Sequence, residues 1–203
     1  MALEAQNVVV AGSGAVWVAP EDTPAPPDLA PLTTPWEDLG YTNEDGVTFT
    51  FSRDQTDLNA WQSSEPVRVL ITAEPKTIAF NLLEFDQQSI LLAFRGGTFT
   101  PGVPPAPDIY TPPDPGTSDV RAIAIDGVDG DLQFRFYFPR VQLSGDVGFQ
   151  LVRTDAVTLS IELSVLAAAS KWQIAANLPG FGVLGAQSQS SSSKESTKAS
   201  AAA

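Results

Sequence analysis

The feature that most constrains the fold of this chain is a strict alternation of apolar and polar residues. In the longest run, Val157–Val165, every second residue is aliphatic and the residues between are Thr, Ser or Glu. A period of two held over nine residues is typical of a β-strand that buries one face. Shorter runs of the same kind occupy Val47–Phe51, Val67–Ile71 and Ile78–Leu82. The chain is therefore predicted to be mainly antiparallel β.

The residues between these runs predict two hairpins. Glu74-Pro75-Lys76 is a short turn sequence, so Val67–Ile71 is expected to pair with Ile78–Leu82. Val120–Asp126 is expected to pair with Leu132–Phe138 across a turn at residues 127–130 that is rich in Gly and Asp. Both hairpins join neighbouring strands, as in a sandwich or barrel.

A single helix is predicted between Asp86, which can act as its N-cap, and Gly96-Gly97, which ends it. Apolar residues at 90, 91 and 94 give this segment a helical stripe. The stretch Ala167–Ala176 is compatible with a strand or with a short helix. The predicted fold class is an antiparallel β-sandwich or barrel with one flanking α-helix.

Proline marks the segments outside this sheet. Six of the 17 prolines lie between Pro20 and Pro35, and seven lie between Pro101 and Pro115. Proline lacks the donor that a central strand or helix needs, so these stretches are predicted to be extended arms or loops. The expected organisation is one domain over 1–186, with an N-terminal arm at 1–35, a Pro-rich loop at 98–118, and a disordered Ser/Ala-rich tail at 187–203.

Composition excludes much of the familiar enzyme chemistry. The chain has no Cys and no His, so disulfides, thiolate metal sites and the commonest general base are absent. Its net charge of −13 is the wrong sign for neutralising phosphates in a nucleic-acid complex. No stretch reaches the length of a membrane span, and no basic leader precedes an apolar run, so a soluble protein made in the cytosol is expected.

Several motifs look chemical but are better explained structurally. Gly12-Ser13-Gly14 lacks the third glycine of a dinucleotide-binding turn, because that position is Trp17, and a strand with a glycine kink is favoured. The acids at 126, 129 and 131 fit a hairpin turn better than a calcium loop. Acidic pairs such as Glu37-Asp38 and Glu44-Asp45, together with Glu162, are better explained as a solvated face than as a glycosidase site. No catalytic residue, cofactor or metal is predicted.

Two features point towards a partner. Trp61 lies in a polar segment, Asp54–Pro66, that has no local core to bury an indole. The indole is therefore either folded back on the domain or offered to a partner, and the sequence leaves both open. Long regular strands also leave unpaired donors and acceptors at sheet edges, which identical copies can close.

Four stretches resemble a known family. The runs Trp36–Arg53, Asn59–Ser64 and Lys76–Ile90, and the opening Val16–Pro20 before a Pro-rich stretch, are similar to the major tail tube proteins of long-tailed, siphovirus-type phages of actinobacteria. The clear resemblance covers about residues 16–97. For the rest of the chain it rests only on the β pattern and on the chain length. Its motifs concern packing and assembly.

The resemblance implies a structural virion protein assembled in the host cytoplasm. Copies are expected to form hexameric rings that stack around a tape-measure protein, end on tail terminator and distal tail proteins, and let DNA pass without specific binding. No membrane insertion is implied. Terminal arms bridge subunits in such proteins, and the loop between the early strands reaches an adjacent ring. The corresponding inter-subunit residues here are Asp54, Asp57, Leu58, Trp61 and Gln62.

An acidic channel would repel DNA and keep it sliding. Glu74, Asp126, Asp129 and Asp131 are candidates for the lumen or its rim because they lie at turns or hairpin ends, where they also suit a purely solubilising role. Three other readings stay open. The chain is alternatively a secreted or surface β-sandwich module that binds carbohydrate or protein, a carboxylate-only enzyme, or a related tail connector or distal ring protein.

Overall fold

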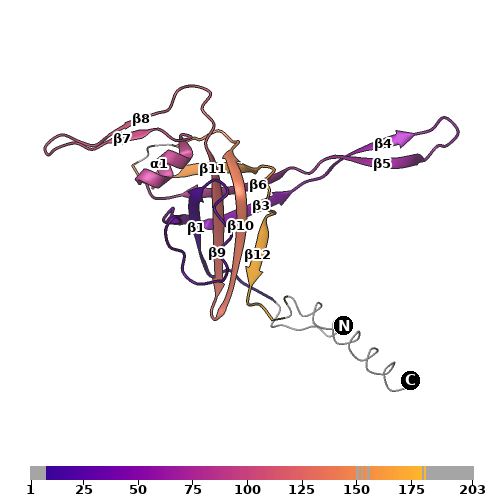
Figure 1. Cartoon of the computed structure of the whole chain (residues 1–203), viewed down its shortest axis with the longest axis horizontal. Coiled ribbons are helices and arrows are strands. Elements are labelled where there is room, and N and C mark those ends of the chain that lie inside the picture. Colours follow the sequence, from indigo (N-terminus) through magenta and orange to yellow (C-terminus); the bar gives the residue numbers. More distant parts are fainter. Residues whose placement is uncertain (1–7, 150, 152, 155, 180, 182–203) are drawn as a thin grey trace, which may run out of the picture.

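The computed structural model describes residues 8–149, 151, 153–154, 156–179 and 181. The predicted tail at 187–203 and residues 1–7 of the predicted N-terminal arm lie outside the described residues. Figure 1 shows a β-rich body from which two narrow arms project on opposite sides. Among the described residues, no helix is long and apolar enough to cross a bilayer.

The body is built on one antiparallel sheet with the strand order β2-β1-β9-β10-β11-β6-β3, and β12 also pairs with β10. Two separate two-stranded sheets, β4-β5 and β7-β8, form the arms. The strand bounds are β1 Ser13–Pro20, β2 Glu37–Asp38, β3 Thr42–Phe51, β4 Asp54–Asn59, β5 Pro66–Ala73, β6 Lys76–Leu82, β7 Thr98–Thr100, β8 Ile109–Thr111, β9 Val120–Asp129, β10 Leu132–Leu143, β11 Leu159–Val165 and β12 Gln173–Ala176.

The mainly β fold class is confirmed, and alternation correctly predicts which residues of the central strands are buried. Leu159, Ile161 and Leu163 of β11 are at most 2% exposed, and they pair in register with the equally apolar side of β6. The sheet curls on itself, because Phe49 of β3 packs 4.7 Å from Phe136 of β10 although these strands are not neighbours in the sheet. The main core therefore lies inside the curl.

The helix prediction is confirmed as α1, Gln87–Ala93. The Asp86 carboxylate accepts a hydrogen bond from the Ser89 backbone N–H at 2.7 Å, as an N-cap should. Gly96 and Gly97 follow with positive φ angles, where glycine carries no steric penalty. The buried side of the helix is formed by Ser89, Leu92 and Ala93, whereas the predicted apolar stripe at 90, 91 and 94 is only half-buried.

The hairpin of β9 and β10 is confirmed with a shorter turn than expected. Asp129 pairs with Leu132, so the turn consists of Gly130 and Asp131 and the strands extend through residues 127–129. The open choice at Ala167–Ala176 is settled as a strand, since Gln173–Ala176 forms β12 beside β10.

The other predicted hairpin is wrong. β5, which contains Val67–Ile71, pairs with β4 and not with β6. β6 instead pairs with β3 and β11, and the Ser52 N–H donates to the Pro75 carbonyl where the chain leaves the body. The prediction of a polar loop over Asp54–Pro66 is also wrong for the first half of that segment, which forms strand β4.

The predicted N-terminal arm and the predicted proline-rich loop each contain strands. Within the predicted arm at 1–35, Ser13–Pro20 is β1, paired along its length with β9. Residues after Pro20 pack on the protomer's own sheet, where Trp36 meets Tyr137 edge-on at 6.1 Å. The predicted loop at 98–118 contains the short strands β7 and β8.

Tyr137 makes the stability of the protomer sensitive to alkaline pH. Its hydroxyl donates to the Thr23 carbonyl at 2.5 Å, and burial raises its pKa, with Asp22 adding to the rise and Ser170 opposing it. A raised folded-state pKa gives stability that is fully present below the unfolded value of about 10 and is lost as pH rises through the folded value. We expect the free energy of unfolding to be level between about pH 8 and 9 and to fall above about pH 10.

Urea unfolding across this pH range measures the effect, and Tyr137→Phe is the matched variant. It should cost about 1–2 kcal/mol at neutral pH because the Thr23 carbonyl loses its donor. The variant should also lose less of its free energy of unfolding at alkaline pH. Part of the loss that remains is expected to come from Tyr110, because burial also raises the pKa of that side chain. An identical alkaline slope in the variant and the native chain would contradict this role.

Candidate functional site

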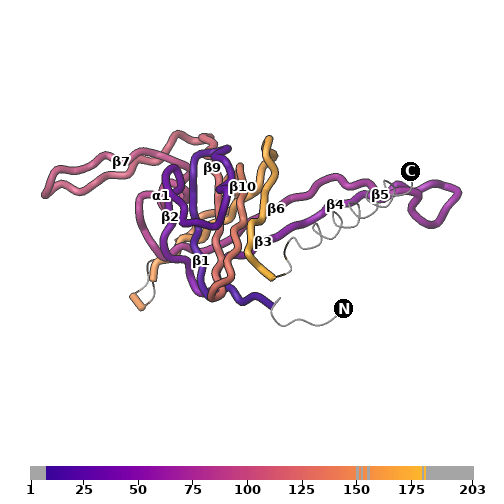
Figure 2. The backbone as a smooth tube through the Cα atoms, turned by 60° about the horizontal axis from the view of Figure 1, so that its bottom comes forward, coloured from indigo at the N-terminus to yellow at the C-terminus, as the bar shows by residue number. Residues whose placement is uncertain are grey.

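The β4–β5 hairpin projects from the body as a narrow arm (Figures 1 and 2). It continues the pairing of β3 with β6, since Phe51 pairs with Lys76 and Asp54 pairs with Ala73 just beyond the edge of the body. Every residue of β4 and of β5 is exposed. A two-stranded hairpin standing free in water is only marginally stable by itself.

The arm carries exposed apolar side chains on both of its faces, mostly from β5, among the polar residues of β4. Val67, Val69 and Ile71 share one face and are 63%, 49% and 55% exposed. On the opposite face lie Leu58 and Leu70. Solvent-exposed apolar residues gathered in this way mark a surface that binds another protein. The arm is therefore suited to insertion between two surfaces rather than to resting on one.

The tip of the arm is a short turn that carries Trp61. The turn is closed by the Ser63 N–H donating to the Ala60 carbonyl at 3.2 Å, and the Ser63 hydroxyl donates to the Glu65 carbonyl. Trp61 is 98% exposed, so the indole is not folded back on the domain. Of the two alternatives that the sequence left open, the structure has the indole presented outward.

The five residues predicted from the resemblance to lie between subunits all fall on this arm. Asp54, Asp57 and Leu58 belong to β4, and Trp61 and Gln62 belong to the tip. Sequence reasoning assigned β5 to the core and missed it as part of the site. The available signal was Leu70. In a strand where Val67, Val69 and Ile71 form the apolar face, position 70 is expected to be polar, and an apolar residue there indicates a second apolar face.

The second arm, β7–β8, leaves the opposite side of the body next to α1 (Figure 1). Its base is fixed by Tyr110, whose hydroxyl donates to the Gly96 carbonyl at 2.6 Å and whose ring packs 5.1 Å from Phe99. Its proline-rich end is exposed, with Val103 at 81%. The chain thus carries an exposed projection on each of two opposed sides.

The four predicted lumen acids do not form one cluster. Asp126, Asp129 and Asp131 lie on the β9–β10 hairpin, whereas Glu74 lies at the base of the β4–β5 arm. Two of the four are in ion pairs: Glu74 contacts Arg53 at 2.9 Å and Asp126 contacts Arg135 at 2.5 Å. The carboxylate of Asp129 accepts a hydrogen bond from the Val10 N–H.

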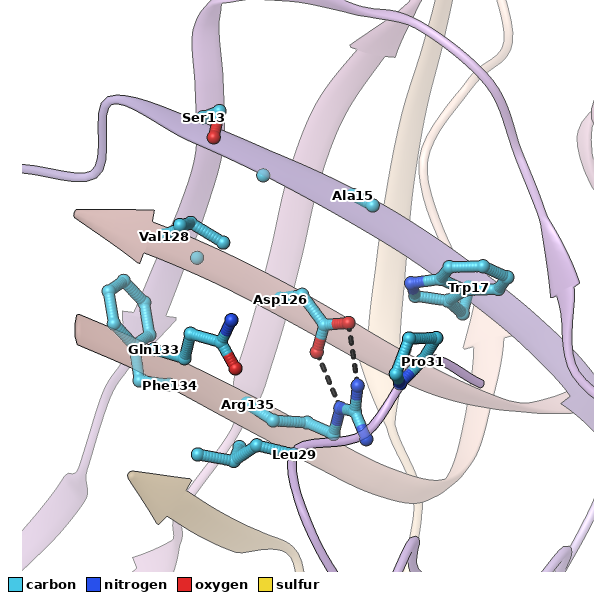
Figure 3. Close-up of a pocket in the computed structure, with 12 residues that line it drawn as sticks. Ser13, Ala15, Trp17, Leu29, Pro31, Asp126, Val128, Gln133, Phe134 and Arg135 are labelled. Carbon is cyan, nitrogen blue, oxygen red and sulfur yellow. Dashed lines mark hydrogen bonds and ion pairs between the residues drawn. The ribbon is translucent and has the colours of Figure 1, made fainter. Parts of the chain in front are cut away.

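A hollow of about 320 Å³ lies between β1, β9, β10 and the segment that follows β1 (Figure 3). Its charged groups are Asp126 and Arg135, which neutralise each other. The Nε1 atom of Trp17 is buried there without a hydrogen-bond partner among the described residues. Within that part of the chain, no group of three or more acidic side chains is arranged to hold a metal ion.

Comparison with known proteins gives one decisive match. The family model described as phage tail tube protein matches residues 1–177. No curated protein matches the sequence. Among solved structures, a chain of the "Cryo-EM structure of the anti-feeding prophage (AFP) baseplate, 6-fold symmetrised" is similar with a TM-score of 0.42 and 10% identity, covering 86% of this chain and 97% of that chain. The family model spans most of the sequence, and the chain belongs to the phage tail tube protein family.

Proposed function

We propose that this phage tail structural protein, a component of the virion, is the major subunit of the tail tube. Copies associate side by side into rings, the rings are hexameric, and they stack into a cylinder through which DNA passes during ejection. The observation that carries the proposal is the β4–β5 arm, which exposes apolar side chains on both faces and ends on a 98% exposed tryptophan. In an isolated protomer the apolar side chains of the arm stay in water and add no stability, whereas in a stack they are covered by the next copy.

The two arms favour head-to-tail contact. They leave the body on opposite sides (Figure 1), so one arm of a copy faces the next copy along a stack. A contact between two different surfaces repeats without limit along an axis, which a tube requires. The further partners are those implied by the family: a tape-measure protein inside the tube and terminator and distal tail proteins at its ends. As a structural subunit, the chain is not proposed to be an enzyme.

Electron microscopy of the purified full chain tests the proposal. We expect rings and tubes in negative stain, with hexameric symmetry in class averages. Assembly should persist at high salt, because apolar contact and strand pairing are screened far less than exposed charges. A particle that remains a 21.5 kDa monomer at high concentration would overturn the proposal and favour a solitary binding module. Single rings that never stack would favour a connector or distal ring protein.

A further inference from the structure

A pair of aromatic side chains lies partly in water at the base of the β4–β5 arm. Phe51, the last residue of β3, is 50% exposed, and Trp172, just before β12, is 37% exposed. Their ring centroids are 5.4 Å apart, and Trp172 also stacks on the buried Phe138 at 6.1 Å. The core therefore holds the indole in place while part of both rings stays open to a partner. We call Phe51 and Trp172 the aromatic platform.

The aromatic platform is flanked by positive charge, which is scarce in this acidic chain. Two of the four lysines lie within the described residues, and both are next to the platform: Lys76 pairs in register with Phe51, and Lys171 precedes Trp172. In the part of the chain that the structure describes, no carboxylate pairs with either lysine. A hollow of about 440 Å³ opens there, and its lining residues are Phe51, Ser52, Arg53, Glu74 and Lys76. Unpaired cations beside exposed aromatic rings favour a partner that is both apolar and negatively charged.

The end of the β7–β8 arm has the complementary composition. Four of the seven residues in 101–107 are proline, and Val103 beside them is 81% exposed. The arm and its flanks, residues 98–117, contain the acids Asp108 and Asp114 and no Lys or Arg. Proline-rich segments dock on aromatic surfaces, which they contact with their rings. The arm thus ends on the kind of segment that the aromatic platform fits.

The proline-rich tip is also held in one shape. The Ala106 N–H donates to the Val103 carbonyl at 2.9 Å, and the Gly102 N–H donates to the Asp108 carboxylate at 2.8 Å. A side chain at position 102 would collide with the carbonyls of Ala106 and Pro107, so glycine is required there. A loop that is already fixed loses little conformational entropy when it binds.

The placement of the two surfaces suits contact between two copies. The β7–β8 arm leaves the body on the side opposite the β4–β5 arm, at whose base the platform lies (Figures 1 and 2). The body therefore separates the tip from the platform of its own copy. When the β4–β5 arm of one copy points along a stack to the next copy, the β7–β8 arm of that next copy points back to the first. Both arms then span the same junction in opposite directions.

We propose that the proline-rich tip of β7–β8 docks on the aromatic platform of a second copy of this chain. This inference rests on the proposed function, which supplies the head-to-tail order of the copies. The proline rings and Val103 cover Phe51 and Trp172, and the acids of the arm lie near Lys76 and Lys171. Contact removes apolar surface from water, and the opposite charges select the correct partner surface. Each junction is then held by two arms of different chemistry.

A charge exchange tests the contact. Val103→Lys brings a cation against Lys76 and Lys171 and should raise the protein concentration needed for tube assembly about tenfold or more, because like charges in an interface repel. Val103→Glu, at the same exposed position, is the matched control and should assemble close to the native concentration. Lys171→Glu alone should weaken assembly, and combining it with Val103→Lys should recover part of the loss. Sedimentation of tubes over a range of protein concentrations measures all four variants.

Cross-linking tests where the tip lies. The chain has no cysteine, so Val103→Cys carries its only thiol at the tip and Ser52→Cys carries one in the hollow beside the platform. In tubes assembled from an equal mixture of these variants, a short bismaleimide should join the two kinds of chain. A mixture of Val103→Cys with Thr33→Cys, whose thiol lies in the exposed segment packed on β9 and β10, should give no such product.

The outcomes separate this inference from the proposed function. Tubes that form without a cross-link between positions 103 and 52, or that assemble equally well from Val103→Lys and Val103→Glu, overturn the inference and leave the tube in place. A specific cross-link between these positions in protomers that never form tubes supports the contact and overturns the tube. Folded protomers that give neither tubes nor the cross-link overturn both.

Discussion

Replacing Trp61 with alanine is expected to leave the protomer folded and to abolish long tubes. The indole is 98% exposed, so its removal takes nothing from the core of an isolated copy. If the tip is inserted in a neighbouring copy, an anchoring aromatic of this kind is worth about 2 kcal/mol or more per contact. Every subunit in a ring contributes one tip, so the losses accumulate between rings. Negative-stain electron microscopy should show short stacks or single rings.

Trp36→Ala is the matched control, since it removes the same side chain from a buried position. Trp36 is 8% exposed and packs against Tyr137, and its loss should lower the free energy of unfolding by about 3–5 kcal/mol. The two variants should therefore have opposite phenotypes in urea unfolding and in tube yield. Tubes of native length and number from Trp61→Ala would contradict the role given to the arm.

The misassignment of β5 shows what alternation encodes and what it leaves out. Val157–Val165 and Val67–Ile71 both alternate, and both indicate a strand with a buried face. For β11 the covering side chains come from other strands and from α1 of the same chain, so the pattern and the structure agree. For β5 the described part of the same chain leaves every residue exposed. A local alternating pattern indicates that one face of a strand is buried. It carries no information on whether the same chain or another molecule buries that face.

The helix and the β9–β10 hairpin were predictable because their signals are local. Asp86 caps α1 through a residue three positions away, and Gly130 supplies the positive φ that its two-residue turn requires. The pairing of β5 with β4 was missed because Pro75 was interpreted as the turn of a hairpin. In the structure it lies where the chain leaves the arm and enters the body, and the Pro75 carbonyl still accepts a bond from Ser52.

The packing of the N-terminal segment on the protomer's own sheet could not be predicted from the sequence either, since it depends on long-range contacts, of which those of Arg135 are an example. Arg135 is 3% exposed. Its guanidinium binds the Asp126 carboxylate at 2.5 and 2.8 Å and donates to the carbonyls of Asp28 and Ala30 at 2.9 and 3.1 Å. In the sequence Arg135 is only the polar residue between Phe134 and Phe136. Its partners more than 100 residues away cannot be inferred from that position.

Arg135→Met should therefore destabilise the protomer more than the removal of any other described ion-pairing residue. The substitution keeps an unbranched apolar stem but leaves the Asp126 carboxylate, whose side chain is 20% exposed, and two carbonyls without their donor. Breaking a buried pair from one side costs about 3–5 kcal/mol, and the partial exposure of Asp126 places the expected loss near the lower end. Urea unfolding measures it, and limited proteolysis should show new cleavage between residues 21 and 35.

Arg53→Met is the matched control, because Arg53 is also paired with a carboxylate, that of Glu74, at 2.9 Å. Both of those side chains are about half exposed, and such a pair contributes about 0–1 kcal/mol. Adding Asp126→Asn to Arg135→Met should recover part of the loss, since it removes the uncompensated charge. A loss from Arg135→Met no larger than that from Arg53→Met would mean that the segment is held by apolar packing around Trp36 alone. The four hydrogen bonds of the guanidinium would then only replace bonds that the same groups make with water in the unfolded chain.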